Sequence, residues 1–110
     1  MITTRMIVQA VAEYRGVSVV DICSARRDRP ATDARHVCFW LAKQLTELSL
    51  PSIGRLIGYR DHTTVLHGAN KVERLRHLQP ELNRELEELE GILIGIDNAA
   101  VALAVRTVKD

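Results

Sequence analysis

Apolar residues recur at steps of three and four along most of the chain, the spacing that places them on one face of an α-helix. The first such run follows Thr3 and Thr4, whose hydroxyl groups can cap a helix, and it stops at Gly16. Its apolar positions are Met6, Ile7, Ala10, Val11 and Tyr14. The pattern therefore predicts an opening helix that ends before Gly16.

A second, shorter helix is predicted to begin at Ser18, with Asp21 three residues further on in a capping-box relation. Its buried side is expected to consist of Val19, Val20, Ile22 and Cys23. Residues 24–31 are polar and basic and contain Pro30, so we expect a loop there.

A third helix is predicted from a cap at Thr32 to about Leu48. Its core positions are Ala34, Val37, Cys38, Leu41, Leu45 and Leu48. Phe39 and Trp40 widen this apolar face, and we expect one of the two to be partly exposed.

Two further helices follow with a tight turn between them. Ser49 is the predicted cap of the fourth helix, in which Pro51 loses no intrahelical hydrogen bond, and Gly58 ends it. After Tyr59 and Arg60, Asp61 caps a fifth helix. The apolar positions are Ile53, Leu56 and Ile57 in the fourth helix and Val65, Leu66, Ala69, Val72 and Leu75 in the fifth. Two helices joined by such a Gly-containing turn predict a helix-turn-helix.

The last predicted helix opens at Pro80. Its apolar positions are Leu82, Leu86, Leu89, Leu93 and Ile96. We expect Asp97 and Asn98 to interrupt it, which leaves an apolar extension over residues 97–110. The expected fold is all-α, with about six helices and a central helix-turn-helix in one domain of residues 1–96.

Composition narrows the class of protein. The chain has 110 residues, of which 46% are hydrophobic and 26% charged, so it is long enough for one packed domain but short for an ATPase. It has no signal peptide, no long apolar run and no zinc-like spacing of its two cysteines, so we expect a cytoplasmic, nucleoid-associated protein without a membrane partner. Because it also lacks a P-loop and an HExxH motif, we expect no catalytic residue, cofactor or metal.

The first turn of the fifth helix carries side chains that can read bases. Asp61 can accept a hydrogen bond from a base amino group, and His62 can donate or accept one. Thr63 and Thr64 can each offer a methyl group to thymine and a hydroxyl to a base or phosphate. An acidic residue would repel the phosphate backbone, so its position favours base selection. The alternative is an ordinary, well-capped helix.

Candidate phosphate contacts lie nearby in the predicted fold. His67 and Lys71 stand four residues apart on one helix face, and three arginines at 26, 27 and 29 suit a narrow minor groove. Arg35 and His36 near the start of the third helix could hold a phosphate, and Lys43 is a weaker candidate. The alternative for all of these is a solvated basic surface.

The segments 49–54 and 58–67, which read SLPSIG and GYRDHTTVLH, resemble the C-terminal DNA-binding domain of the bacterial replication initiator DnaA. The similarity covers residues 3–95. It implies a six-helix domain that binds the T/A-rich, asymmetric DnaA box. By this resemblance, Arg27, Asp61, His62, Thr63 and Thr64 are the base-reading residues. The phosphate-binding set that it implies is Arg26, Arg35, His36, Lys43, Arg60, His67 and Lys71, with backbone amides near Leu50 and Pro51.

The chain also departs from the family pattern. Ala25, Asp28 and Asp33 make the arginine loop less basic, which predicts weaker binding with a flatter salt dependence. His36 stands where Gln is common, and Tyr59 replaces a frequent Gly.

These features predict a stand-alone binder of DnaA-box-like double-stranded DNA that modulates replication initiation or transcription without ATPase activity. The alternative is a protein-interaction module that binds the replication initiator or its regulators. The C-terminal Leu-rich segment is, in addition, a candidate seam for a homodimer.

Overall fold

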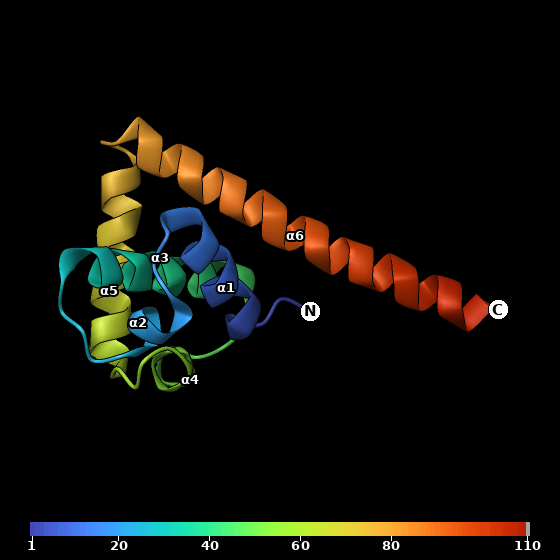
Figure 1. The fold of residues 1–110 in the computed structure, drawn as a ribbon, viewed down its shortest axis with the longest axis horizontal. Helices are drawn as coiled ribbons and strands as arrows, with labels where there is room; N and C mark the ends of the chain where they lie inside the picture. The colour runs from blue at the N-terminus through green and yellow to red at the C-terminus, as the bar shows by residue number, and fades with distance from the viewer. Residues whose placement is uncertain (110) are drawn as a thin grey trace.

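The chain forms six α-helices and no strand over the part that the computed structural model describes, which is the backbone of residues 1–109 and the side chains of residues 1–106 (Figure 1). The helices are α1 (Thr4–Arg15), α2 (Val19–Cys23), α3 (Arg29–Leu45), α4 (Leu50–Leu56), α5 (His62–Arg76) and α6 (Pro80–Lys109). The predicted all-α class and the helix-turn-helix, formed by α4 and α5, are confirmed. Asp110, the end of the predicted extension, lies outside the described residues.

Short polar side chains cap the first five helices. The predicted caps at Thr3, Ser18, Ser49 and Asp61 are confirmed, since each side chain accepts a hydrogen bond from an amide in the first turn. The predicted start of the third helix at Thr32 is wrong. Asp28 caps α3 instead, and the helix begins at Arg29 because Pro30 fits the first turn without losing a hydrogen bond.

Helix α3 is the centre of the domain and contacts all five other helices. Both Phe39 and Trp40 are buried, at 0% and 2% exposure, so the expectation that one would be partly exposed is wrong. A helix surrounded on most sides has few positions left that face water. The ring of Trp40 is also covered by Arg76, whose guanidinium carbon lies 4.9 Å from the ring centroid.

Several predicted core positions are exposed because the peripheral helices pack on one side only. Helix α2 buries Ile22 but leaves Val19 and Val20 exposed, and in α4 Leu56 is exposed while Ile53 is buried. Leu48 lies beyond the end of α3 and is also exposed. Single exposed apolar residues of this kind are common on soluble proteins.

The predicted interruption at Asp97 and Asn98 is wrong, because α6 continues through both residues. Asp and Asn cost a helix interior only about 0.7 kcal/mol each, and the carboxylate of Asp97 accepts a hydrogen bond from the amino group of Met1. The first half of α6 packs on the core through Leu82, Leu86, Leu89 and Leu93. The second half projects away from the domain (Figure 1). Among the described helices, even this one falls short of the apolar length needed to span a bilayer.

Two glycines allow the close approaches that position α4 and α5. A Cβ atom at Gly54 would lie 1.9 Å from the carbonyl oxygen of Arg60, in the turn between the two helices. At Gly68, a Cβ atom would lie 2.7 Å from Cδ2 of His36, where α5 crosses α3. The backbone then turns through positive φ at Gly58 and Tyr59, at 82° and 52°.

Candidate nucleic-acid interface

The start of α5 presents the predicted base-reading residues to solvent. Asp61, His62, Thr63 and Thr64 are all exposed. The Asp61 carboxylate accepts a hydrogen bond of 2.8 Å from the Thr64 amide. This bond, together with one from the Thr64 hydroxyl, lowers the pKa of Asp61, so the residue is ionised at neutral pH. Asp61 is therefore an exposed, ionised helix cap at the start of α5.

The exposed face of α5 continues beyond its first turn. Thr63 and His67 share this face with Asn70 and Arg74, since the four residues follow one another at steps of four, three and four. Asn70 was not predicted as a site residue, although its spacing of three residues from His67 indicates that both lie on the same face of the helix. An Asn side chain can pair with adenine through two hydrogen bonds, which makes Asn70 a further candidate reader.

The two leading arginines of the loop before α3 have different surroundings. Arg27 is exposed, and none of the described carboxylates forms an ion pair with it. Arg26 instead donates to Asp28 at 2.7 Å and to Asp21 at 3.2 Å. The charge of Arg26 is therefore neutralised by two carboxylates. Of these two arginines, Arg27 is the one whose charge is accessible.

Arg35 was expected to hold a phosphate, but its side chain is only 4% exposed. Its guanidinium donates to backbone carbonyl oxygens of the preceding segment, with a bond of 2.7 Å to Ile22 as the shortest. The other acceptors are the carbonyl oxygens of Asp21, Ser24 and Arg26. Burial, reinforced by the neighbouring charge of Arg60, lowers the pKa of Arg35. The guanidinium donors of Arg35 are engaged by these backbone carbonyl oxygens, so this buried side chain is not available to bind a phosphate.

Arg60 also has a structural role that its predicted phosphate contact did not include. Its guanidinium donates to the Ser24 carbonyl oxygen at 3.0 Å and to that of Gly58, while its backbone amide donates to Gly54 at 2.9 Å. The turn of the helix-turn-helix is thereby tied to the loop that carries Arg26 and Arg27.

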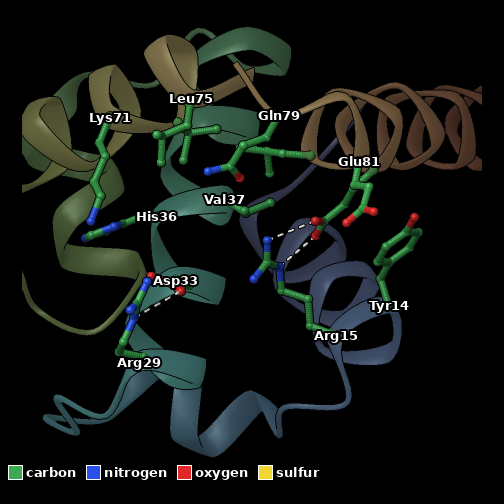
Figure 2. A pocket seen from close by; sticks show the side chains of 13 residues that line it. Tyr14, Arg15, Arg29, Asp33, His36, Val37, Lys71, Leu75, Gln79 and Glu81 are labelled. Atoms are coloured by element: carbon green, nitrogen blue, oxygen red, sulfur yellow. Dashed lines mark hydrogen bonds and ion pairs between the residues drawn. The ribbon is translucent and has the colours of Figure 1, made fainter. Parts of the chain in front are cut away.

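His36 and Lys71 converge from α3 and α5. Figure 2 shows the Lys71 amino group directed toward the His36 ring. The ring packs beneath Gly68 and lies 6.3 Å from Phe39, between ring centroids. Burial lowers the pKa of His36, and the charge of Lys71 lowers it further. Because His36 is neutral and Lys71 is exposed, Lys71 is the side chain of this pair that offers a positive charge to a phosphate.

The remaining predicted contacts lie on α3, α4 and α5. Lys43 is exposed in the last turn of α3, and His67 is exposed on α5. Leu50 and Pro51 form the first turn of α4, as expected. A proline has no N–H group, so a phosphate at this turn can receive an amide hydrogen bond from Leu50 but not from Pro51.

Charge is divided between two parts of the molecule. Residues 24–76 carry ten Lys and Arg against five Asp and Glu, whereas residues 80–97 carry one Arg against six acidic residues. The net charge of +1 conceals this division. The loop before α3, the helix α4 and the start of α5 lie together at one edge of the domain, away from α6 (Figure 1). This edge combines accessible cations with side chains that can donate to and accept from base edges.

Comparison with known proteins identifies the family to which this chain belongs. The family described as the bacterial dnaA protein helix-turn-helix matches residues 4–72, which is more than half of the chain. The chain belongs to this family. The expectation drawn from the two sequence segments is therefore confirmed, and the matched dnaA helix-turn-helix region runs from α1 into α5.

Curated relatives agree with the family match. The chain is 47% identical over 94 residues to the chromosomal replication initiator protein DnaA of Caulobacter sp. (strain K31), an alignment that covers 86% of the chain and 19% of the relative. It is 46% identical over 94 residues to the protein of that name from Bordetella pertussis, covering 86% of the chain and 20% of the relative. The chain thus spans about a fifth of the length of the curated relatives that it matches.

Proposed function

We propose that this chain binds double-stranded DNA sequence-specifically at DnaA-box-like sites. The observation that carries the proposal is the exposed group of Asp61, His62 and Thr63 at the start of the second helix of a helix-turn-helix. In DNA-binding proteins of this architecture, the N-terminal residues of that helix contact base edges in the major groove. Membership of the dnaA helix-turn-helix family supports the same reading.

Each accessible residue has a role in this proposal. The exposed carboxylate of Asp61 accepts from a base amino group, and His62 and Thr63 contact neighbouring bases. Thr64, whose hydroxyl already bonds Asp61, contributes mainly its methyl group. Arg27 enters the minor groove, to which charged arginines are attracted where the groove is narrow.

The proposed phosphate contacts come from four elements. Lys71 and His67 extend from α5, Lys43 from α3 and the Leu50 amide from α4. His36 gives a polar contact beside Lys71 in its neutral form. Arg26 contacts a phosphate only after its bonds to Asp21 and Asp28 rearrange. Contacts of this kind fix the position of a protein on the duplex without reading its sequence.

The proposed biological role is to modulate replication initiation or transcription as a nucleoid-associated protein without ATPase activity. The name of these relatives, chromosomal replication initiator protein, supports a role at sites that an initiator also occupies. The chain would then compete with the initiator for these sites or assist it there.

Fluorescence anisotropy with a box duplex and a scrambled duplex tests the specificity. We expect tighter binding to the box at moderate salt, and equal affinity for both duplexes would contradict the proposal. Asp61→Ala, His62→Ala and Thr63→Ala should each relax base choice at a cost of about 1–3 kcal/mol, whereas Lys71→Ala should weaken binding to all sequences alike.

Asp61→Asn separates base reading from helix capping. Asn is as good an N-cap as Asp, so this variant should keep the stability of the domain. It replaces one acceptor oxygen by an amide donor, so it should change the preferred base. A variant that unfolds normally and retains the wild-type preference would show that Asp61 is a cap alone.

A protein-interaction module that binds the initiator or its regulators is the second candidate. Two observations favour it: the charge of Arg26 is balanced by two carboxylates, and the second half of α6 exposes apolar side chains. In this case the chain would bind an initiator protein in a pull-down assay and show no preference for the box duplex.

A further inference from the structure

We propose that the chain forms an antiparallel homodimer through the face of α6 that points away from its own core. We call this face the outer seam and define it by Gly91, Ile94, Gly95, Asn98, Val101, Ala102 and Val105. The line from Gly91 through Ile94, Asn98 and Val101 to Val105 advances in steps of three and four, which is the repeat of a helix–helix seam. This inference depends on α6 alone and is independent of the proposed DNA binding.

The outer seam is open in the single chain. The exposed fractions of Ile94, Val101 and Val105 are 43%, 52% and 48%. A Cβ atom built at Gly91 or Gly95 would meet nothing within 4 Å. From Gly91 to Val105 the only polar residues are Asp97 and Asn98, so the helix is apolar almost all round. A helix of this kind is usually buried, which indicates that another surface covers it.

The order of large and small residues favours a second copy running in the opposite direction. When two copies are reversed about Asn98, Gly91 lies opposite Val105, Gly95 opposite Val101, and Ile94 opposite Ala102. Each large side chain then faces a small one, which allows close packing. The two Asn98 side chains meet at the centre, where a paired polar residue can fix the register of a helical seam.

Charge also distinguishes the two directions. Glu88 and Arg106 lie on the same flank of the outer seam, near its two ends. In the antiparallel arrangement Glu88 of one copy, whose Oε2 accepts a hydrogen bond of 2.8 Å from the Tyr14 hydroxyl of its own chain, approaches Arg106 of the other, so opposite charges meet. A parallel arrangement would keep Glu88 of one copy and Arg106 of the other at opposite ends of the seam, and it would put Gly91 opposite Gly91, leaving a gap.

The position of the outer seam suits a DNA-binding protein. The projecting half of α6 lies on the opposite side of the domain from α4 and the start of α5 (Figure 1). A dimer would therefore leave both candidate interfaces free. A lipid surface is the less favoured occupant, because residues 81–90 of the same helix carry five Glu against one Arg, and these would be repelled by anionic headgroups.

Sedimentation velocity on the 110-residue chain tests the proposal over a concentration series into the high micromolar range. We expect a monomer–dimer equilibrium, and Val101→Glu should raise the dissociation constant by about tenfold or more by burying a charge. The matched control is Leu78→Glu, which places the same charge at an exposed apolar residue outside α6. A chain that stays monomeric throughout, or a dimer that Val101→Glu leaves unchanged, would overturn the proposal.

Cysteine cross-linking tests the direction in a Cys23→Ser background, since the other cysteine, Cys38, is fully buried. Asn98→Cys should form a disulfide-linked dimer, whereas Val105→Cys alone should not. A mixture of the Gly91→Cys and Val105→Cys chains should cross-link into a heterodimer. Efficient cross-linking of Val105→Cys to itself would indicate a parallel seam and contradict the antiparallel one.

A charge exchange gives an independent check on the same geometry. Arg106→Glu and Glu88→Arg should each weaken the dimer severalfold, and the double variant should recover most of the loss. Failure of the double variant to recover would contradict the predicted contact. Sedimentation of a monomeric chain with phosphatidylcholine–phosphatidylglycerol vesicles would instead identify a lipid surface as the occupant, and would also overturn the dimer.

Discussion

Arg35 and Arg60 donate hydrogen bonds to the same acceptor, the carbonyl oxygen of Ser24, at 3.1 and 3.0 Å. Arg35 belongs to α3 and Arg60 to the turn between α4 and α5, so this carbonyl joins three parts of the domain. The loop that begins at Ser24 carries Arg27, which is exposed and forms no ion pair with the described carboxylates. The two arginines thereby position a candidate minor-groove residue relative to the candidate major-groove helix.

Replacing Arg35 should destabilise the domain strongly. Arg35→Ala removes a guanidinium donor from four backbone carbonyl groups, of which those of Asp21 and Ser24 keep other donors, and this should lower the free energy of unfolding by about 2–4 kcal/mol. Arg60→Ala should cost less, because Arg60 is only half-buried. Urea denaturation measures both variants, with the exposed Arg27→Ala as a control expected within about 0.5 kcal/mol of the wild type.

A double-mutant cycle between Arg35 and Arg60 tests the shared acceptor. Two donors to one carbonyl should not contribute additively, so we expect an interaction term of at least about 0.5 kcal/mol. Additive effects of the two substitutions would indicate that Ser24 does not connect them.

Gly54 should tolerate no side chain. In Gly54→Ala the new methyl group would overlap the carbonyl oxygen of Arg60, in the turn whose geometry sets the position of α5. We expect a loss of more than about 4 kcal/mol, or a chain that does not fold, as judged by circular dichroism and thermal unfolding. Gly95→Ala is the control: its Cβ meets open space in a helix interior, so it should stabilise the monomer by about 0.5–1 kcal/mol.

Removing one carboxylate near Arg26 should strengthen DNA binding. Asp21→Asn takes away one of the two ion pairs of Arg26, which should free it for a phosphate and steepen the dependence of log affinity on log salt by about 1. The salt dependence is measured by anisotropy with the box duplex. The same substitution in an Arg26→Ala background should change the slope much less, and an equal change in both backgrounds would contradict this explanation.

The domain should become less stable as the pH is lowered, partly because His36 becomes protonated. Its pKa is lowered in the folded state by burial and by Lys71, against a smaller opposing effect of Asp33. The unfolded chain therefore takes up the proton first, so this contribution to stability is fully present above about pH 6.5 and is lost as the pH falls toward the folded pKa. Urea denaturation from pH 7.5 to pH 5 should show a smaller loss in His36→Gln. An equal loss in the variant and the wild type would exclude His36 as the cause.

The sequence determined most of the local structure of this protein. Thr3, Ser18, Ser49 and Asp61 mark the starts of their helices because each supplies a side-chain acceptor to amides that have no other partner within the helix. The order of α4, a short turn and α5 followed from Gly58 and the caps on either side. The start of α5 could be identified in the same way, since its cap, Asp61, directly precedes it in the chain.

Only the tertiary structure decided which charged residues are accessible. Arg35 and Arg27 are equally basic in the sequence, yet one is enclosed by backbone carbonyls from a segment up to 14 residues away and the other faces solvent. The contact of Asp97 with the Met1 amino group, at the far end of the chain, is likewise made only in the folded chain. Helix caps and apolar spacing are set by near neighbours, whereas burial of a side chain is set by elements that only the folded chain brings together.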